Sequence, residues 1–346
     1  MTNQYSLPQL GWNHFFQQQL SLEEWESCSI ARVIGVERSQ LILLAEAGKQ
    51  NLNITHSTPP IAVGDWILLT DGGLFHRLFE RSSLFSRKAA GTKVNTQLIA
   101  ANVDTAFIVC SMNMDFNLNR IERYLALTNE SGADPVIVLT KADCCENPQE
   151  FVQKAQELDQ LLNVIAVNSL DKGNVKQLDP WCNNGKTIAF LGSSGVGKST
   201  LINTLLGSIT QETSSIREDD SKGRHTTTSR SLHLLESGGL LLDSPGMREL
   251  QLADCEQGVE ETFSEIVDLA TTCRFADCTH TSEPGCNVRE AIANGSLDER
   301  RLLSYQKLMR EQAFNSATLA EKRAKDKEFG KMVRSVMKGK QKAKDL

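Results

Sequence analysis

A glycine-rich motif near the middle of the chain constrains the fold more than any other feature of the sequence. Residues 192–199 read GSSGVGKS and match the pattern GxxxxGK[ST] at every required position. The motif follows the apolar run 187–191 and precedes a segment with helical character. A strand, this loop and a helix place successive backbone N–H groups around phosphate oxygens at the helix N-terminus. The sequence therefore predicts a phosphate-binding loop.

The side chains of this loop are predicted to bind a nucleoside triphosphate together with Mg²⁺. We expect Lys198 to reach the β- and γ-phosphate oxygens as a catalytic residue, and Ser199 to offer its hydroxyl to Mg²⁺. The residues predicted to contact the nucleotide here are Gly192, Ser193, Ser194, Gly195, Val196, Gly197, Lys198, Ser199 and Thr200.

A second apolar run, further along the chain, ends in the pattern DxxG. Its aspartate, Asp243, is predicted to hold Mg²⁺ through water, and the backbone N–H of Gly246 to meet the γ-phosphate. The polar segment 223–228 between the two motifs reads GRHTTT, and one of its threonines is predicted to complete the Mg²⁺ shell in the triphosphate state. The sequence does not choose among the three candidates, which are Thr226, Thr227 and Thr228.

A base-reading element is predicted before the phosphate loop. Residues 140–143 read TKAD, close an apolar run and resemble the NKxD element of GTPases. We expect the Asp143 carboxylate to accept hydrogen bonds from the N1–H and the exocyclic amine of guanine, a donor pair that adenine lacks, with the stem of Lys141 over the ring. The predicted base-binding residues are Thr140, Lys141, Ala142 and Asp143, with Asn168 and Ser169 in a base-supporting loop.

The order of these motifs departs from that of ordinary GTPases, in which the phosphate loop comes first. Here the base-reading element precedes the phosphate loop, and DxxG follows it. Apolar runs alternate with amphipathic segments from about residue 103 to residue 250, which predicts a mainly parallel sheet with crossover helices. A circular permutation accounts for both observations, because it keeps the sheet and moves the chain termini.

Different sequence patterns flank this central α/β region. The first ninety residues contain short strand-like runs separated by turn residues, typical of a small β-barrel of the oligonucleotide-binding or SH3-like kind. Beyond residue 250 the pattern is helical, with one long helix expected over residues 288–315. Three thiols and one imidazole lie within fourteen residues there and form a closed structural set for tetrahedral Zn²⁺. The predicted zinc ligands are Cys273, Cys278, His280 and Cys286.

The charge and hydropathy of the sequence indicate where the protein is located and what it binds. The 346 residues carry 37 Lys and Arg against 43 Asp and Glu, which gives no overall sign of nucleic-acid binding. Residues 321–346 have ten basic and four acidic residues, and this tail is predicted either to contact phosphates or to extend into solvent. We find neither a secretory signal nor a membrane span, so we expect a cytoplasmic protein with no membrane partner. With no legible oligomer interface, we expect a monomer.

The segments as a set resemble one known family. They read GSSGVGKST, GRHTTT and DSPGMREL, after TKAD and before CRFADCTHTSEPGC, and are similar to the ribosome small-subunit-dependent GTPase A family, also called RsgA or YjeQ. The resemblance covers nearly the whole chain. It implies an N-terminal barrel of the oligonucleotide-binding kind at 1–95, a circularly permuted P-loop GTPase domain at 96–250 and a mostly helical zinc-binding domain at 251–346. It also implies a GTP hydrolase that binds the 30S ribosomal subunit and its rRNA late in maturation and leaves upon hydrolysis to GDP.

The sequence leaves alternatives open for how the hydrolytic water is oriented and for which nucleotide base is bound. Met247 stands where many signalling GTPases place a glutamine that orients water, so we expect slow intrinsic hydrolysis that depends on His225 or on groups from a partner. One alternative is an RNA-binding assembly factor that uses nucleotide mainly as a ligand switch. Another is a P-loop enzyme that uses ATP or has relaxed base specificity, suggested by Thr140 in place of asparagine.

Overall fold

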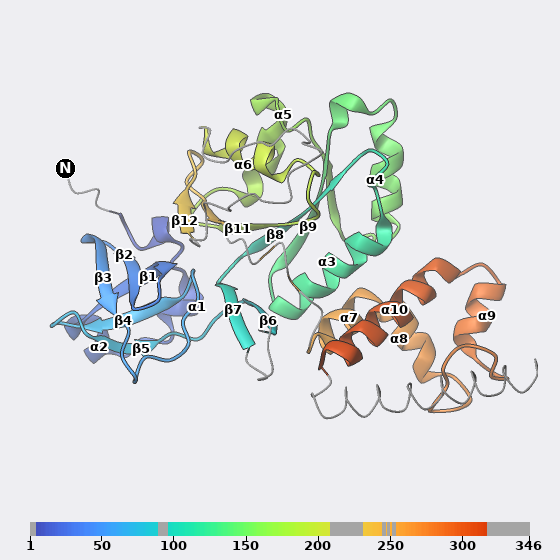
Figure 1. Cartoon of the computed structure of the whole chain (residues 1–346), viewed down its shortest axis with the longest axis horizontal. Coiled ribbons are helices and arrows are strands. Elements are labelled where there is room, and N and C mark those ends of the chain that lie inside the picture. The colour runs from blue at the N-terminus through green and yellow to red at the C-terminus, as the bar shows by residue number, and fades with distance from the viewer. Residues whose placement is uncertain are drawn as a thin grey trace, which may run out of the picture.

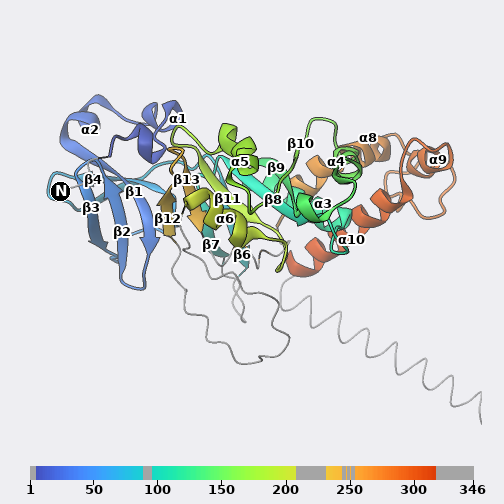
Figure 2. The same cartoon turned by 90° about the horizontal axis from the view of Figure 1, so that it is seen from above.

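The computed structural model describes residues 5–88, 96–207, 231–243, 247, 250 and 254–316. The parts of the chain lie in a row, with an antiparallel sheet at one end, a six-stranded sheet flanked by helices in the middle, and a helical region at the other end (Figure 1 and Figure 2). This is the order of architectures that the sequence predicts.

The N-terminal part is a five-stranded antiparallel sheet, barrel-like in form, with the strand order β3-β2-β1-β4-β5. Its strands are β1 (Cys28–Val36), β2 (Gln40–Ala45), β3 (Gly48–Asn53), β4 (Trp66–Thr70) and β5 (Phe75–Leu78). Because side chains alternate between the faces of a strand, this sheet presents two apolar faces. One face carries Leu43 and Ile67, and the other packs Trp66 against Trp12 and Phe16 of the N-terminal segment. That segment contains the short helices η1 (Pro8–Leu10), α1 (His14–Gln17) and α2 (Leu22–Ser27).

The central sheet has the strand order β10-β9-β8-β11-β13-β12, and only the pair β12 and β13 is antiparallel. Its strands are β8 (Thr105–Ser111), β9 (Asp134–Thr140), β10 (Asn163–Ala166), β11 (Thr187–Leu191), β12 (Ser231–Leu234) and β13 (Leu240–Asp243). Its helices are α3 (Leu118–Ser131), η2 (Ala142–Cys144), α4 (Pro148–Gln156), α5 (Lys172–Val175), η3 (Lys176–Trp181) and α6 (Lys198–Leu206).

Helices cover both faces of this sheet, as its continuous apolar strands require. Phe107 and Val109 of β8 pack on the side of α6, in a core that includes Leu201. Ile108, between them in the sequence, packs on the opposite side with Leu125 of α3. The strand order reverses between β8 and β11, and ligands of such sheets bind at the carboxyl ends of the strands at this reversal.

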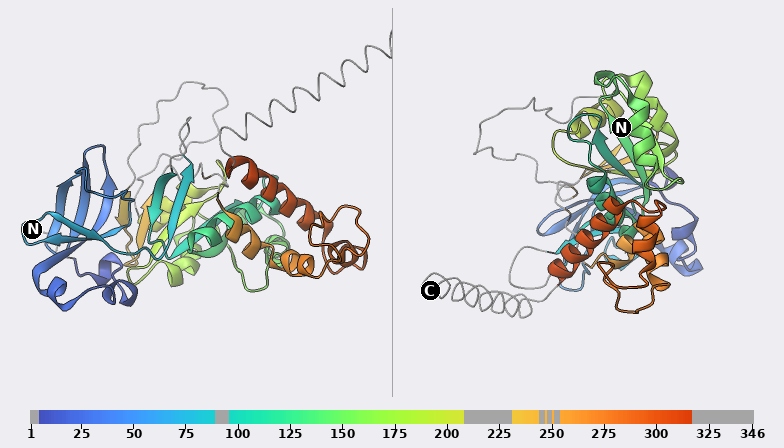
Figure 3. Two further views of the ribbon diagram at one scale, coloured as in Figure 1. Left: turned by 90° about the horizontal axis from the view of Figure 1, so that it is seen from below. Right: turned by 90° about the vertical axis from the view of Figure 1, so that its right-hand side faces the viewer.

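The C-terminal part consists of α7 (Glu256–Thr262), α8 (Ser264–Thr271), α9 (Asn287–Ala293) and α10 (Glu299–Ser316), and Figure 3 shows it at the end of the molecule opposite the barrel. The expectation of one helix over 288–315 is wrong. The chain leaves the helix after Ala293, and Gly295 takes a positive φ of 79°, a conformation that ends helices. None of the helices described is both long and apolar enough to cross a membrane.

A buried arginine joins the barrel to the central sheet. Arg32 of β1 is 1% exposed, and its guanidinium donates to Thr187 Oγ1 at 2.8 Å, to the Asn102 carbonyl at 3.2 Å and to the Gly64 carbonyl at 3.3 Å. Burial lowers the pKa of Arg32 to about 10, which leaves it charged at neutral pH. The hydrogen bond to Thr187 therefore fixes the barrel to the start of β11.

Between the barrel and the central sheet, β6 (Leu84–Lys88) and β7 (Thr96–Ala101) form a two-stranded sheet.

A buried ion-pair network joins α3 to the C-terminal helices. Glu122 of α3 is fully buried and accepts hydrogen bonds from Arg301 at 3.1 Å and from Arg300 at 3.0 Å, both on α10. Arg301 also pairs with Glu265 of α8, and its guanidinium lies 5.0 Å from the centre of the Phe263 ring. The helical region is thus attached to the central domain by charge as well as by apolar packing.

We expect Glu122→Ala to lower the free energy of unfolding by about 3 kcal/mol, because the buried Arg301 loses one of its two carboxylate partners and the partly exposed Arg300 loses its contact with a buried carboxylate. Glu311→Ala is the matched control, since Glu311 joins α10 to Arg123 of α3 through a partly exposed ion pair, and it should cost about 1 kcal/mol or less. Chemical denaturation followed by circular dichroism measures both variants. Equal losses would contradict this role for the buried network.

Candidate nucleotide and metal sites

The glycine-rich loop lies at the reversal of the strand order, between the end of β11 and the start of α6. Gly192 has a φ of 141°, and a Cβ there would lie 2.4 Å from the carbonyl oxygen of Val109 in β8. Gly197, the residue before α6, has a φ of 93°. These two glycines allow the loop to turn tightly against β8 and to leave the first N–H groups of α6 facing the loop, as phosphate binding requires.

Lys198 lies across this loop. Its side chain is buried, and its ammonium donates to the carbonyl oxygen of Gly192 at 2.7 Å and to that of Ser193. Ser194 and Gly195 at the crest of the loop are exposed. A phosphate group held by the loop would meet the ammonium directly, because the ammonium already lies against the loop carbonyls.

The TKAD segment follows the end of β9 at the same edge of the sheet. Lys141 has a positive φ of 62°, which turns the chain sharply, and the next residues form η2. Asp143 in η2 is exposed, and its Oδ2 accepts from the Cys144 thiol at 3.4 Å. This hydrogen bond raises the pKa of the Cys144 thiol, so the thiol stays protonated and acts as a donor at neutral pH. Because Asp143 is exposed, its carboxylate is accessible to the base of a nucleotide.

Two consecutive residues of the TKAD segment bind two consecutive carbonyls of the glycine-rich loop. Thr140 is fully buried, and its hydroxyl donates to the Val196 carbonyl at 2.5 Å, while the Lys141 ammonium donates to the Gly195 carbonyl at 3.1 Å. The predicted base-reading and phosphate-binding elements are thus in direct contact. The Thr140 side chain is directed at the glycine-rich loop, away from the exposed face that carries Asp143.

The predicted base-supporting loop follows β10 and makes hydrogen bonds to α5 and α6. The backbone N–H of Asn168 donates to Asn174 Oδ1 at 2.8 Å, and the Thr204 hydroxyl of α6 donates to the Ser169 carbonyl at 2.7 Å. The Ser169 hydroxyl is buried and has no hydrogen-bond partner within the described part of the chain. A buried unpaired hydroxyl is costly, which makes it a candidate for contact with a ligand. The sequence did not indicate Asn174 or Thr204, because neither belongs to a motif.

The DxxG region is described only in part. Asp243 ends β13, which pairs with β11, so its backbone lies at the same edge of the sheet as the glycine-rich loop. Gly246 and the segment 223–228, which contains His225, lie outside the described residues. Met247 is 2% exposed and belongs to a core that includes Val259 of α7. The residue after DxxG thus packs in a core shared with the helical region.

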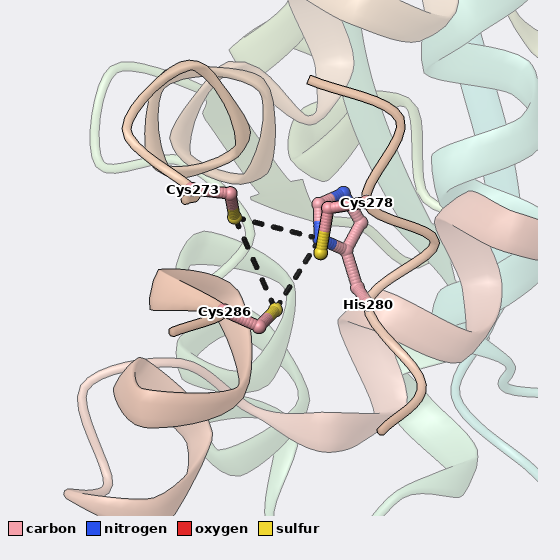
Figure 4. A group of neighbouring side chains, drawn as sticks. All are labelled: Cys273, Cys278, His280 and Cys286. Atoms are coloured by element: carbon pink, nitrogen blue, oxygen red, sulfur yellow. Dashed lines mark hydrogen bonds between the residues drawn. The ribbon is translucent and has the colours of Figure 1, made fainter. Parts of the chain in front are cut away.

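The four predicted metal ligands come together in the C-terminal part, and Figure 4 shows their side chains directed at one another. The His280 Nδ1 lies 3.4 Å from the Cys286 sulfur and 3.8 Å from the Cys273 sulfur, and these two sulfurs are 4.0 Å apart. All four ligand atoms, with that of Cys278, lie within 4.8 Å of one another. Ligands around Zn²⁺, at about 2.3 Å for sulfur and about 2.0–2.1 Å for nitrogen, are roughly 3.5–3.8 Å apart in a tetrahedron. The set therefore fits a tetrahedral metal ion.

Together these features define a class of protein: a circularly permuted P-loop nucleotide-binding domain between an antiparallel barrel and a helical region with a Cys₃His cluster. The model of the RsgA GTPase family matches residues 78–253. The chain belongs to this family, as the sequence resemblance predicted.

Named relatives cover almost the whole chain. "Small ribosomal subunit biogenesis GTPase RsgA 2" from Vibrio parahaemolyticus is 60% identical over 336 residues, which is 97% of this chain and 94% of the relative. "Small ribosomal subunit biogenesis GTPase RsgA" from Mesorhizobium japonicum is 45% identical over 317 residues, covering 90% of this chain and 91% of the relative.

Solved structures share the fold. YjeQ from Thermotoga maritima aligns with a TM-score of 0.60 and 24% identity, over 82% of this chain and 98% of that one. YloQ, described as a circularly permuted GTPase, aligns with a TM-score of 0.58 and 22% identity, over 84% of this chain and 96% of that one. The predicted fold class, with its permuted central domain, is confirmed.

Proposed function

We propose that this protein hydrolyses GTP to GDP and phosphate during maturation of the small ribosomal subunit. The observation that carries the proposal is the direct contact between the TKAD segment and the glycine-rich loop at the reversal of the sheet. A base bound at Asp143 and a phosphate chain bound at Lys198 would belong to one nucleotide. The names of the relatives support the biological setting.

We propose a role for each residue, supported by its position. The loop from Gly192 to Thr200 surrounds the phosphates, Lys198 stabilises the charge that develops on the β- and γ-phosphate oxygens, and Ser199 offers its hydroxyl to Mg²⁺. Asp143 accepts from guanine and Lys141 lies over the ring. We propose Asp243 and Gly246 for Mg²⁺ and the γ-phosphate, and His225 as a group that assists hydrolysis.

Guanine is the base that this arrangement favours. The ATP alternative rested on threonine in place of asparagine at position 140. Because the Thr140 side chain is buried against the glycine-rich loop, the substitution affects how the two elements are attached, and the acceptor pair for guanine remains on Asp143. We propose that Asn168 and Ser169 support the base from the third loop.

The ends of the chain are proposed to bind the ribosomal particle. We assign the barrel to residues 1–95, the GTPase domain to 96–250 and the metal-binding domain to 251–346, with Zn²⁺ at the Cys₃His cluster as a structural ion. The barrel, the helical domain and the basic tail would contact rRNA, and the tail would add salt-dependent affinity through its ten basic residues. We propose a monomer that acts in the cytoplasm and has no membrane partner.

Co-sedimentation with purified small subunits tests this function. With a non-hydrolysable GTP analogue the protein should bind at least about fivefold more tightly than with GDP, because the γ-phosphate couples the nucleotide site to the subunit-binding surface. The matching ATP analogue should behave like no nucleotide, and large subunits serve as the control particle. Equal binding in both guanine-nucleotide states would contradict a cycle in which hydrolysis leads to release.

A further inference from the structure

A partly exposed glutamate, Glu283, organises the loop that carries the histidine of the Cys₃His cluster. Its carboxylate accepts hydrogen bonds from three successive parts of the loop: the backbone N–H groups of Thr279 at 2.9 Å, Thr281 at 2.9 Å and Ser282 at 3.0 Å. The hydroxyl groups of Thr279 and Thr281 donate to the same carboxylate. One side chain thus accepts five hydrogen bonds from within five residues of chain.

These hydrogen bonds lie on both sides of His280. The residue before the histidine and the residue after it both donate a backbone N–H to Glu283. His280 itself has a positive φ of 59°, a conformation that is unfavourable for residues other than glycine. In this conformation the imidazole Nδ1 lies 3.4 Å from the Cys286 sulfur, so the backbone geometry that Glu283 stabilises is the one that presents the ligand.

We propose that Glu283 is a positioning residue for the metal site, and that it sets metal affinity by holding the His280 backbone in its ligand-presenting conformation. The proposal rests on the proposed zinc site, and it adds a residue that donates no ligand atom. Outer residues that orient metal ligands typically change metal affinity by about 10- to 100-fold when they are replaced.

The ionised carboxylate is the form that this role needs. Hydrogen bonds from the Thr279 hydroxyl and from the loop backbone hold the pKa of Glu283 well below its usual range, so the group only accepts at neutral pH. A glutamine side chain would keep the length but present an NH₂ group to a ring of donors, and could satisfy fewer of them. The far side of the loop is held separately, because Gln306 of α10 donates to the Thr279 carbonyl at 3.2 Å.

The test compares zinc affinity in the full chain and in two variants by competition with a coloured chelator. Glu283→Gln should bind Zn²⁺ about 10- to 100-fold more weakly and release it faster to the chelator. Glu290→Gln is the matched control, because it makes the same change of charge at an exposed position of α9, four residues beyond Cys286. It should bind Zn²⁺ within about twofold of the unaltered chain. Guanine-nucleotide binding, measured in parallel, should be equal in all three proteins and reports that each is folded.

Unchanged zinc affinity in Glu283→Gln would overturn the proposal. An equal loss in both variants would also overturn it, because the effect would then follow from charge near the thiolates and not from hydrogen bonds to the loop. Failure of the zinc site itself is a separate result: the unaltered chain would hold no zinc, whereas failure of the inference alone leaves one zinc bound with the same affinity in the unaltered chain and in Glu283→Gln.

Discussion

Lys198→Ala should lower GTP hydrolysis by about 100-fold or more. The Lys198 ammonium is buried and already lies against the loop carbonyls, so its charge acts at short range where the phosphate oxygens would bind. Removal of one preorganised group that stabilises transition-state charge typically costs about 10²–10³ in kcat. Single-turnover hydrolysis in the presence of saturating nucleotide measures the effect on the chemical step.

Lys186→Ala provides the control for this variant. Lys186 precedes β11, at the opposite end of the strand from the glycine-rich loop, and its ammonium pairs with the partly exposed Asp104. Its replacement should leave hydrolysis within about twofold, since exposed ion pairs contribute about 1 kcal/mol or less to stability. If Lys198→Ala retained the activity of Lys186→Ala, the glycine-rich loop would not be the site of hydrolysis.

Asp143→Asn should weaken GDP binding by about 100-fold or more and favour xanthosine nucleotides instead. The carboxylate accepts from two guanine donors, and an amide would keep one acceptor but place its NH₂ against the exocyclic amine. Xanthine carries an oxygen where guanine has its amine, and that oxygen can accept from the new NH₂. Competition of GDP, XDP and ADP against a fluorescent nucleotide measures the change.

Asp134→Asn is the control for the base-reading residue, because Asp134 begins the same strand, β9, at its far end and is exposed. It should leave the preference for GDP intact. Unchanged selectivity in Asp143→Asn would contradict the assignment of guanine recognition to this carboxylate, and preference for ADP in the unaltered chain would favour the ATP alternative.

The sequence predicts best what short segments determine. The glycine-rich loop needs only its own spacing and the strand before it, and the Cys₃His cluster lies within fourteen residues. The contact of Thr140 with Val196 joins residues 56 positions apart, so no local pattern could assign the threonine hydroxyl to the phosphate loop. From the sequence, threonine in place of the asparagine of NKxD suggested weaker selectivity for guanine. In the structure the Thr140 hydroxyl instead donates to a backbone carbonyl of the glycine-rich loop.

The contacts that join the barrel and the helical region to the central domain could not be predicted from the sequence either. Arg32 reads as one basic residue in a strand, yet it is buried where it meets Thr187, which lies 155 positions further along. Glu122 reads as the polar face of an amphipathic helix, and only the docking of α10 makes it a buried acceptor. The break at Gly295 was missed because the apolar pattern continues on both sides of it, while the backbone turn depends on one glycine.

The segment just beyond DxxG links the nucleotide site to the helical region. Met247 and Leu250, just beyond DxxG, are buried in the same core as residues of α3 and α7. A change at the γ-phosphate would therefore act on a core that the central and C-terminal parts share. This supports the proposed coupling between hydrolysis and release from the subunit.

The most direct measurement is multiple-turnover hydrolysis of GTP and of ATP by the purified protein, each with and without small ribosomal subunits. The account predicts slow hydrolysis of GTP alone, stimulation of at least about tenfold by small subunits through groups supplied by the partner, and no stimulated hydrolysis of ATP. A GTP rate that small subunits leave unchanged, or an ATP rate that rises equally, would contradict it.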